Sequence, residues 1–279
     1  MRSALVTGAS TGIGRATVLR LDASGWRVFA GVRKAEDVDS LGAAGSGRIS
    51  PLILDVTEAE QIAAAVERVG AEAEGRLDGL VNNAGIAIPG PLETLPLDDF
   101  RRQIEVNLTA QVGVTQALLP LLRQARGRTV FISSIGGRIA FPLNGAYHAA
   151  KFGLEAVGDV LRQELRPWGM PVSIVEPGSI DTPIWERGER TSEEIEARAH
   201  PDQEALYGEA IAGFRKLVKK LADRGMPPEQ VAKAVARALE ARRPRARYLV
   251  GRDARLQARL KTVLPTPVFD RIVARTLSS

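Results

Sequence analysis

The fold is decided by one early stretch, which reads Ser3-Ala4-Leu5-Val6-Thr7-Gly8-Ala9-Ser10-Thr11-Gly12-Ile13-Gly14. Its first five residues form a short apolar run typical of a buried strand, and residues 15–23 continue in a helical pattern. Glycines let the backbone turn tightly, and a helix N-terminus directs free N–H groups at an anion. The spacing is G-x-x-x-G-x-G, directly after the strand, which predicts a dinucleotide phosphate site. The expected pyrophosphate contacts are Gly8, Ser10, Thr11, Gly12, Ile13 and Gly14.

The end of the second predicted strand indicates which dinucleotide is bound. This strand covers residues 26–31, and Val32, Arg33 and Lys34 follow it, with no acid before Glu36. An acidic residue here would bind the ribose 2′-hydroxyl, whereas a guanidinium holds a 2′-phosphate with paired hydrogen bonds. We therefore expect Arg33 and Lys34 to favour NADP(H) over NAD(H). The alternative is that both are solvated surface cations.

A candidate proton-transfer site lies further along the chain. Tyr147 and Lys151 stand four residues apart, and Ser134 precedes the tyrosine by thirteen residues. Residues four apart share one face of a helix. The Lys151 ammonium is therefore expected to stabilise the Tyr147 phenolate and to lower the tyrosine pKa from about 10. A tyrosine tuned in this way is an efficient acid–base catalyst, and the Ser134 hydroxyl can orient a substrate oxygen.

Strand-like and helical stretches alternate along the chain. Further strands are predicted at residues 48–54, 79–82, 128–133 and 172–176, and long helices at 58–74, 97–126 and 146–166. Such alternation predicts an α/β fold, with a Rossmann-type, doubly wound, mostly parallel sheet and helices on both faces. The sequence has no low-complexity linker and no internal repeat, so we expect one domain over residues 1–279. Ligands should bind at the carboxyl ends of its strands.

Together these motifs resemble those of the short-chain dehydrogenase/reductase family. They occur in order between residue 3 and about residue 182. The matching positions are Thr7 to Gly14, Asp55-Val56, Asn82-Asn83-Ala84-Gly85, Asn107, Ser134, Tyr147, Lys151, Pro177-Gly178 and Thr182.

The resemblance implies a role for each matched residue. Tyr147 exchanges a proton with the substrate oxygen during hydride transfer, Ser134 orients the carbonyl, and Lys151 holds the nicotinamide ribose. Asn107 is expected to hold a water that links Lys151 to solvent; the alternative is an amide that bonds to a neighbouring strand. The remaining implied cofactor contacts are Asp55, Val56, Asn83, Ala84, Gly85, Pro177, Gly178, Ile180 and Thr182, with Tyr147 and Lys151 at the nicotinamide.

The composition excludes several classes of protein. The chain has no cysteine, which excludes disulfides and thiol catalysis and fits a cytoplasmic enzyme. The first predicted strand begins at about residue 3, which leaves no room for a signal peptide. No apolar run reaches the ~18 residues of a membrane-spanning helix. The two histidines, His148 and His200, have no ligand pattern around them, so no metal site is expected. His148 is interpreted as structural or at the cofactor rim.

Positive charge is concentrated toward the C-terminus. The net charge is +5; residues 242–261 hold eight Lys or Arg and one acid, Asp253, which gives +7 and leaves −2 for the rest. A helix over residues 253–262 would carry paired stripes, which are Arg255 and Arg259, and Leu256 and Leu260. We interpret the tract as a solvated basic face packed on the domain by its leucines. The alternative is peripheral membrane contact. Nucleic-acid binding is not expected, because no nucleic-acid-reading module accompanies the charge.

The stretch after Thr182 is expected to cover the substrate. In related enzymes this segment, here about 183–225, forms a lid. The expected substrate contacts are Ser134, Ile135, Phe141, Leu143, Tyr147 and Trp185, with Ile184 beside them. Their apolar members indicate a lipophilic alcohol or ketone, and core packing is the alternative. The C-terminal extension, about 242–279, more loosely resembles that of hydroxysteroid and retinol dehydrogenase-like members.

Three functions follow as candidates. The first is an NADP(H)-dependent oxidoreductase that interconverts a carbonyl and a secondary alcohol on a lipophilic small molecule, such as a ketone, steroid or retinoid. The second is a reductase of 3-oxoacyl groups on an acyl carrier protein, with the basic tract as docking surface. The third is a non-catalytic NADP(H)-binding regulator, against which the intact catalytic set argues. By analogy, a homodimer or homotetramer is expected through helices 97–126 and 146–166.

Overall fold

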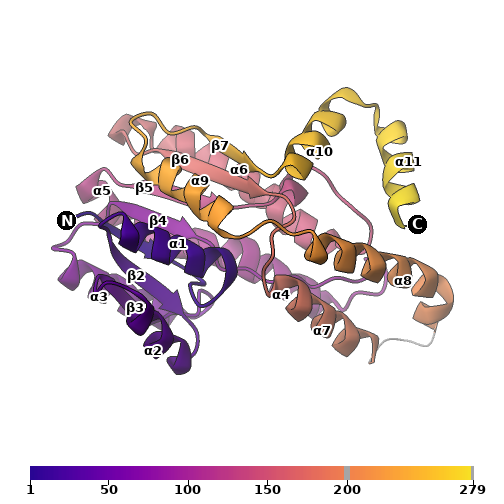
Figure 1. The fold of residues 1–279 in the computed structure, drawn as a ribbon, viewed down its shortest axis with the longest axis horizontal. Coiled ribbons are helices and arrows are strands. Elements are labelled where there is room, and N and C mark those ends of the chain that lie inside the picture. The colour runs from indigo at the N-terminus through magenta and orange to yellow at the C-terminus, as the bar shows by residue number, and fades with distance from the viewer. Residues whose placement is uncertain (198–201, 278–279) are drawn as a thin grey trace.

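The protein is built on a seven-stranded parallel sheet, seen in a computed structural model that describes residues 1–197 and 202–277 (Figure 1). The strand order is β3-β2-β1-β4-β5-β6-β7. The strands are β1 (Ser3–Val6), β2 (Arg27–Val32), β3 (Ile49–Ile53), β4 (Gly79–Asn82), β5 (Arg128–Ile132), β6 (Val172–Pro177) and β7 (Arg247–Val250). The predicted doubly wound α/β fold is confirmed, and six strands lie where they were expected. Strand β7 was not predicted.

Helices cover both faces of the sheet. One face carries α1 (Gly12–Ala23), α2 (Ala35–Ala44) and α9 (Glu229–Glu240), and the other α3 (Ala59–Glu72), α5 (Ala110–Ala125) and α6 (Gly145–Glu164). Successive strand residues point to opposite faces. Val6 and Val130 therefore enter the core beneath α1 and α9, whereas Leu5 and Phe131 enter the core beneath α5 and α6. All four are fully buried, which explains why these strands are apolar throughout.

The strand order reverses between β1 and β4. From β1 the chain moves outward to β2 and β3, and it then returns to β4 on the other side of β1. Loops that leave the carboxyl ends of β1 and β4 therefore diverge and open a crevice, which is where open α/β sheets bind ligands.

The helix predicted at residues 97–126 is continuous but not uniform. It consists of α4 (Leu97–Ile104), a π-helical turn η1 (Glu105–Thr109) and α5. Asn107 lies in the π-helical turn and is fully buried. Such turns are rare and occur frequently at functional sites.

Four helices lie together at one end of the sheet: α7 (Ile184–Glu196), α8 (Asp202–Asp223), α10 (Arg252–Val263) and α11 (Thr266–Leu277) (Figure 1). Helix α11 contacts α8, and α10 contacts the short 3-10 helix η2 (Ile135–Gly137). A separate apolar cluster joins η2, α10 and α11, formed by Ile135, Ile139, Ala254, Ala258, Phe269 and Val273. The C-terminal helices therefore pack beside the loop that begins at Ser134.

Helix α10 confirms the helix expected at residues 253–262, but the expected packing face is wrong in part. Ala254 and Ala258 are buried and Leu260 packs against the cluster, whereas Leu256 is 58% exposed. Small alanine side chains let α10 approach η2 closely, and this turns Leu256 outward.

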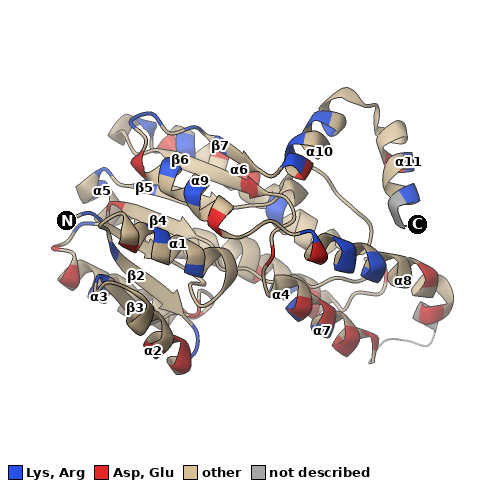
Figure 2. Cartoon of the chain, in the orientation of Figure 1, with Lys and Arg blue, Asp and Glu red and all other residues tan. Residues whose placement is uncertain are grey.

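Charge is unevenly distributed over the surface (Figure 2). Lys and Arg residues are frequent on α10, whereas acidic residues are frequent on α7. Within residues 1–197 and 202–277, no helix combines the length and the apolar character needed to cross a membrane. The same described ranges hold no cluster of three or more His, Cys, Asp or Glu side chains that could bind a metal ion.

Candidate active site

The glycine-rich turn between β1 and α1 is shaped to admit a phosphate group. Gly8 and Gly12 have φ values of +62° and +53°, in the left-handed region that favours glycine. A Cβ on Gly14 would lie 2.2 Å from the Gly8 carbonyl oxygen, so a larger residue would not fit. Thr11 makes no side-chain cap hydrogen bond, and the first turn of α1 holds no acid. The N–H groups and dipole of α1 therefore suit an anion such as a dinucleotide pyrophosphate.

Hydrogen bonds tie the loop after β4 to this turn. The Thr7 hydroxyl accepts from the backbone N–H groups of Asn83 (2.9 Å) and Ala84 (3.0 Å). The Asn83 amide donates to the carbonyls of Thr7 (2.9 Å) and Gly8 (3.0 Å). These bonds hold the motif at Asn83–Gly85 against the glycine-rich turn, so the two proposed cofactor-binding segments are adjacent.

Two cations follow β2, at the predicted adenosine end of the site. Lys34 Nζ lies 3.0 Å from Glu36 Oε1, and both side chains are exposed. Arg33 is exposed and has no ion pair or hydrogen bond with the described part of the chain. Asp55, after β3, accepts from the Thr57 N–H (3.0 Å) and hydroxyl (2.8 Å) through Oδ1. Arg33 is therefore the freer of the two predicted phosphate ligands.

The three expected catalytic side chains come together at the carboxyl edge of the sheet. Ser134 follows β5, and its hydroxyl accepts from the Gly136 N–H (3.0 Å) and hydrogen-bonds with Tyr147. Tyr147 and Lys151 lie one turn apart on α6, with Lys151 Nζ 5.7 Å from the centroid of the tyrosine ring. Lys151 is buried and donates to the Ile132 carbonyl at the end of β5 (2.8 Å). Strand β5 and helix α6 thus hold the set between them.

Burial controls both ionisable groups of this set. Burial raises the pKa of Tyr147, and the hydrogen bond with Ser134 opposes the rise. The expectation of a lowered tyrosine pKa is therefore wrong in this structure, because burial of the phenol outweighs the opposing effects. The Lys151 ammonium instead donates to the Ile132 carbonyl. Burial also lowers the pKa of Lys151 to about 8, opposed by the charge of Glu155 one turn further along α6. A protonated phenol thus stands beside an ammonium that holds its proton weakly.

Asn107 anchors the π-helical turn to the loop after β4. Its Oδ1 accepts from the Ile86 N–H, and its Nδ2 donates to the Ile86 carbonyl, each at 2.9 Å. Gln103, one turn earlier, bonds in the same way to the Ile88 N–H (2.7 Å) and the Ile86 carbonyl (3.0 Å). The Asn107 side chain therefore has the backbone-bonding role considered as the alternative, and a water between Asn107 and Lys151 stays a prediction.

His148 fixes the loop between Ser134 and Phe141, in agreement with the structural one of its two interpretations. Its Nδ1 lies 2.9 Å from the Gly136 carbonyl oxygen, and its Nε2 accepts from the Phe141 N–H (3.0 Å). These partners assign the proton to Nδ1 of a neutral ring. Burial lowers the pKa of His148 and so favours that neutral form. Both partners are backbone groups, so no residue pattern in the sequence marks this contact.

The predicted nicotinamide loop begins where Pro177 ends β6, and it lies next to the glycine-rich turn. A Cβ on Gly12 would lie 2.9 Å from Thr182 Cγ2. Ile180 is buried, and its carbonyl accepts from the Trp185 indole N–H (2.7 Å). This bond joins the loop to the first turn of α7.

Gly178 lets α10 approach the end of β6. A Cβ on Gly178 would lie 2.3 Å from Oδ2 of Asp253, and the same oxygen accepts from the Ser179 N–H (2.8 Å). Asp253, the single acid of the basic tract, is therefore a structural link between the C-terminal helix and the nicotinamide loop.

An apolar cavity lies between α7, α8 and the N-terminus of α6. It has about 480 Å³ of empty space, part of which is open to solvent. Ile184 and Trp185 line it from α7, and Phe214 and Val218 from α8. Asn144, three residues before the active-site tyrosine, is also part of the wall. The α8 residues were not predicted, because they are scattered through a charged stretch of sequence.

The four apolar residues among the predicted substrate contacts divide into two groups, whereas Ser134 and Tyr147 line neither this cavity nor the adjoining one. Trp185 lines this cavity, and Leu143 lines an adjoining space of about 300 Å³. Ile135 and Phe141 line neither of these two cavities and instead pack with α10 and α11. The core-packing alternative therefore describes Ile135 and Phe141.

A glycine-rich turn at a sheet reversal, with Ser134, Tyr147 and Lys151 beside it, defines a class of protein, the NAD(P)-dependent oxidoreductases of Rossmann fold. The short chain dehydrogenase family profile matches residues 2–193. The chain belongs to the short-chain dehydrogenase/reductase family, and it is an oxidoreductase that acts on CH–OH or carbonyl groups with NAD(P).

Similar proteins include both dehydrogenases and reductases. Retinol dehydrogenase 5 of Mus musculus is 42% identical over 278 residues, which cover 96% of this chain and 86% of that protein. The NADPH-dependent 3-dehydrocapnine reductase of Ornithobacterium rhinotracheale is 35% identical, over 99% and 98% of the two chains. The crystal structure of a short-chain dehydrogenase from Streptomyces avermitilis has a TM-score of 0.76 at 30% identity, covering 98% and 94%.

Proposed function

We propose that the protein interconverts a carbonyl and a secondary alcohol on a lipophilic small molecule, with NADP(H) as cofactor. The observation that carries the proposal is the apolar cavity whose wall includes Asn144, three residues before Tyr147, in a chain that also pairs the Ser134 and Tyr147 hydroxyls. The relatives named for retinol and for NADPH-dependent reduction support the substrate class and the cofactor. A regulator that only binds the cofactor would not need the paired hydroxyls of Ser134 and Tyr147.

The chain supplies proton transfer and orientation in this reaction. When bound, the nicotinamide cofactor supplies or accepts the hydride. Tyr147 donates its phenolic proton to the carbonyl oxygen in reduction and takes it back in oxidation, while the Ser134 hydroxyl bonds to the same oxygen. Lys151 holds the nicotinamide ribose. Because burial raises the Tyr147 pKa, the phenol keeps its proton at neutral pH, which is the form that carbonyl reduction needs.

The test is NADPH oxidation with a panel of ketones, steroids, retinoids and long-chain 3-oxoacyl thioesters, the last with and without an acyl carrier protein. We expect turnover of lipophilic ketones or aldehydes, and Tyr147→Phe should abolish it while leaving NADPH affinity within about twofold. Turnover that requires the carrier protein would favour the 3-oxoacyl reductase instead. NADPH binding without turnover of any carbonyl would favour the non-catalytic regulator.

The preference for NADP(H) is proposed to rest on Arg33. Its guanidinium is exposed and unpaired within the described chain, in contrast to that of Lys34, whose ammonium pairs with Glu36. Arg33→Asp should weaken NADPH binding by at least about tenfold and leave NADH binding unchanged or improved. Equal affinities for both cofactors before and after the change would contradict this assignment.

Residues about 183–225 are proposed as the substrate lid; the segment 198–201 lies outside the described residues. Helices α7 and α8 of this segment supply Trp185 and Phe214 to the cavity wall. Trp185→Ala should raise KM for a lipophilic substrate more than it lowers kcat, because it removes apolar contact with the bound molecule.

Peripheral membrane contact is proposed for α10 and α11. Leu256 and Val263 are 58% and 78% exposed, and exposed Arg255 and Arg259 accompany them on α10. Apolar side chains beside arginines suit the surface of an anionic membrane. The protein should pellet with anionic vesicles at low salt and not with neutral ones, and Arg255→Glu with Arg259→Glu should stop it. Without membrane attachment, the protein would be expected in the cytoplasm.

A homodimer or homotetramer is proposed through α4, α5 and α6. Phe152 and Val160 of α6 are 44% and 51% exposed and lie on one side of that helix. Light scattering after gel filtration should give two or four times the 30.0 kDa chain mass. Phe152→Asp should reduce the measured mass of a dimer to that of one chain, or the mass of a tetramer to that of a dimer.

A further inference from the structure

We propose that Arg247, on strand β7, is a positioning residue for Lys151: it holds the Glu155 carboxylate and keeps it from pairing with the lysine ammonium. The inference rests on the proposed function, in which Lys151 must stay free to hold the nicotinamide ribose. It links the strand that the sequence did not predict to the residue on which cofactor binding depends.

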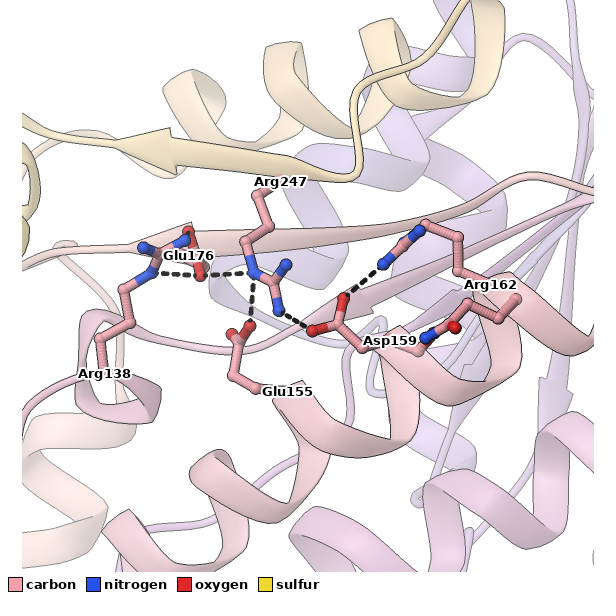
Figure 3. Close-up of polar contacts among 7 residues, drawn as sticks. Arg138, Glu155, Asp159, Arg162, Glu176 and Arg247 are labelled. Carbon is pink, nitrogen blue, oxygen red and sulfur yellow. Dashed lines mark hydrogen bonds and ion pairs between the residues drawn. The ribbon is translucent and has the colours of Figure 1, made fainter.

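Arg247 lies at the centre of a largely buried charge network (Figure 3). Its Nε is 3.0 Å from Glu155 Oε2 and 3.5 Å from Glu176 Oε1, and its Nη2 donates to Asp159 Oδ2 at 2.6 Å. Arg138 binds Glu176 through two hydrogen bonds, of 2.7 and 3.0 Å. Glu176 is fully buried and Glu155 is 8% exposed. Each of these two carboxylates therefore depends on arginine for its counter-charge.

The network contacts each segment that carries an active-site group. Arg138 directly follows η2, the short helix capped by Ser134. Glu155 lies one helical turn after Lys151 on α6, and Glu176 precedes the nicotinamide loop at the end of β6. Through these bonds β7 fixes the relative positions of η2, α6 and β6, as Figure 3 shows.

Glu155 lies between two cations that compete for it. Arg247 bonds to its Oε2, whereas Oε1 is buried without a hydrogen-bond partner in the described structure. The charge of Glu155 already opposes the effect of burial on the pKa of Lys151. The charged and titratable groups around Glu155 and Lys151 come from every element packed there. They are Tyr147 and Asp159 on α6, Arg138 after η2, Glu176 on β6 and Arg247 on β7.

Removal of the guanidinium would free Glu155 to turn toward Lys151. Residues at i and i+4 of a helix are neighbours, so the two side chains can meet without a change in the backbone. An ion pair there would hold the ammonium charged to higher pH and direct it away from the cofactor.

The experiment measures the titration of Lys151 directly. The chain has seven lysines, so ¹³Cε-lysine labelling gives few NMR signals, and loss of one signal in Lys151→Arg identifies Lys151. Wild type should titrate near the value of about 8 set by burial. Arg247→Met should raise the midpoint by about one pH unit or more. Glu155→Gln should lower it, and the double variant should behave as Glu155→Gln alone.

Arg162→Met is the matched control, because Arg162 bonds to Asp159 at 2.9 Å and reaches neither Glu155 nor Glu176. It should leave the midpoint unchanged. A Lys151 midpoint that stays constant in folded Arg247→Met, or that moves equally in Arg162→Met, overturns the proposal. If Arg247→Met does not fold, Glu155→Gln decides, and an unchanged midpoint there also overturns it. The titration needs no cofactor, so failure of the proposed function would be recognised separately, by absent NADPH binding.

Discussion

Lys151 connects burial to pH dependence at the scale of a single residue. Its pKa is lowered to about 8 by burial, so the ammonium loses its proton at mildly alkaline pH. We expect the Kd of NADPH to rise by up to about tenfold per pH unit above pH 8, because the charged form holds the ribose. Fluorescence titration from pH 7 to 9.5 measures this. Lys151→Met should bind weakly at every pH, and a similar alkaline rise in that variant would contradict the assignment.

The lowered pKa of Lys151 also determines how its burial affects the stability of the fold as the pH changes. The unfolded lysine has a pKa near 10.5, above that of the folded protein, so the unfolded chain binds the proton more tightly. Burial of Lys151 therefore costs stability below about pH 8, and the cost fades as the pH rises to about 10.5.

His148 gives a prediction on the acid side. Its neutral ring bonds to Gly136 and Phe141, and burial lowers its pKa below 6.5. The unfolded chain binds the proton first, so this stability is lost as the pH falls below about 6.5. Urea unfolding at pH 5, 6 and 7 should show a decline that His148→Asn lacks, with the variant about 1–3 kcal/mol less stable at pH 7. An unfolding free energy that falls with pH equally in the wild type and in His148→Asn would contradict this prediction.

Active-site identities were predictable at this scale, whereas their electrostatics were not. Ser134, Tyr147 and Lys151 were found by spacing, and the structure brings them together. The direction of the Tyr147 pKa shift was wrong, because it depends on burial and on the partner of Lys151, a backbone carbonyl that carries no residue pattern.

At the scale of elements, α7 reaches the phosphate site. Arg187 Nη2 lies 3.5 Å from the Thr11 hydroxyl at the N-cap of α1. We expect Arg187 to contact the cofactor pyrophosphate, so Arg187→Gln should raise the Kd values of NADPH and NADH by the same factor, about fivefold. Arg190, one turn on and 3.9 Å from Glu186, is the matched control. Arg190→Gln should change neither value, and a loss confined to NADPH would assign Arg187 to the 2′-phosphate instead.

The elements missed by sequence reasoning have physical reasons. Strand β7 is four residues long, begins with Arg247 and follows a run of arginines, so its pattern resembles a solvated loop. It lies at the edge of the sheet, and its arginine is half-buried among three carboxylates that are distant in the sequence. The π-helical turn at Asn107 was missed because the bonds of the Asn107 amide to Ile86, which hold it, are long-range.

At the scale of the whole molecule, cofactor binding should stabilise the fold as a unit. The proposed contacts come from α6 and from the segments that follow β1, β2, β3, β4 and β6, so the cofactor would join most of the sheet. NADPH at 100 times its Kd should add about 2.7 kcal/mol to the unfolding free energy and raise Tm by roughly 5–10 °C. Differential scanning calorimetry measures this. At the same NADPH concentration, Arg33→Asp should lose at least about half of this stabilisation, and it should keep the stabilisation by NADH. A gain from neither cofactor in wild type would argue against dinucleotide binding.

The charge network also has a consequence for biosynthesis. Arg247 follows Lys151 by 96 residues (247 − 151), which a ribosome adds in about 5–20 s at its usual rate. During that interval Glu155 has been made, but the Arg247 guanidinium that neutralises it has not, whereas Glu176 already has Arg138 as a partner. An isolated carboxylate resists entry into an apolar interior. The nascent chain should therefore not pack α6 against β6 in the native way until β7 has been synthesised. A stalled polypeptide that ends before Arg247 should be a substrate for chaperones.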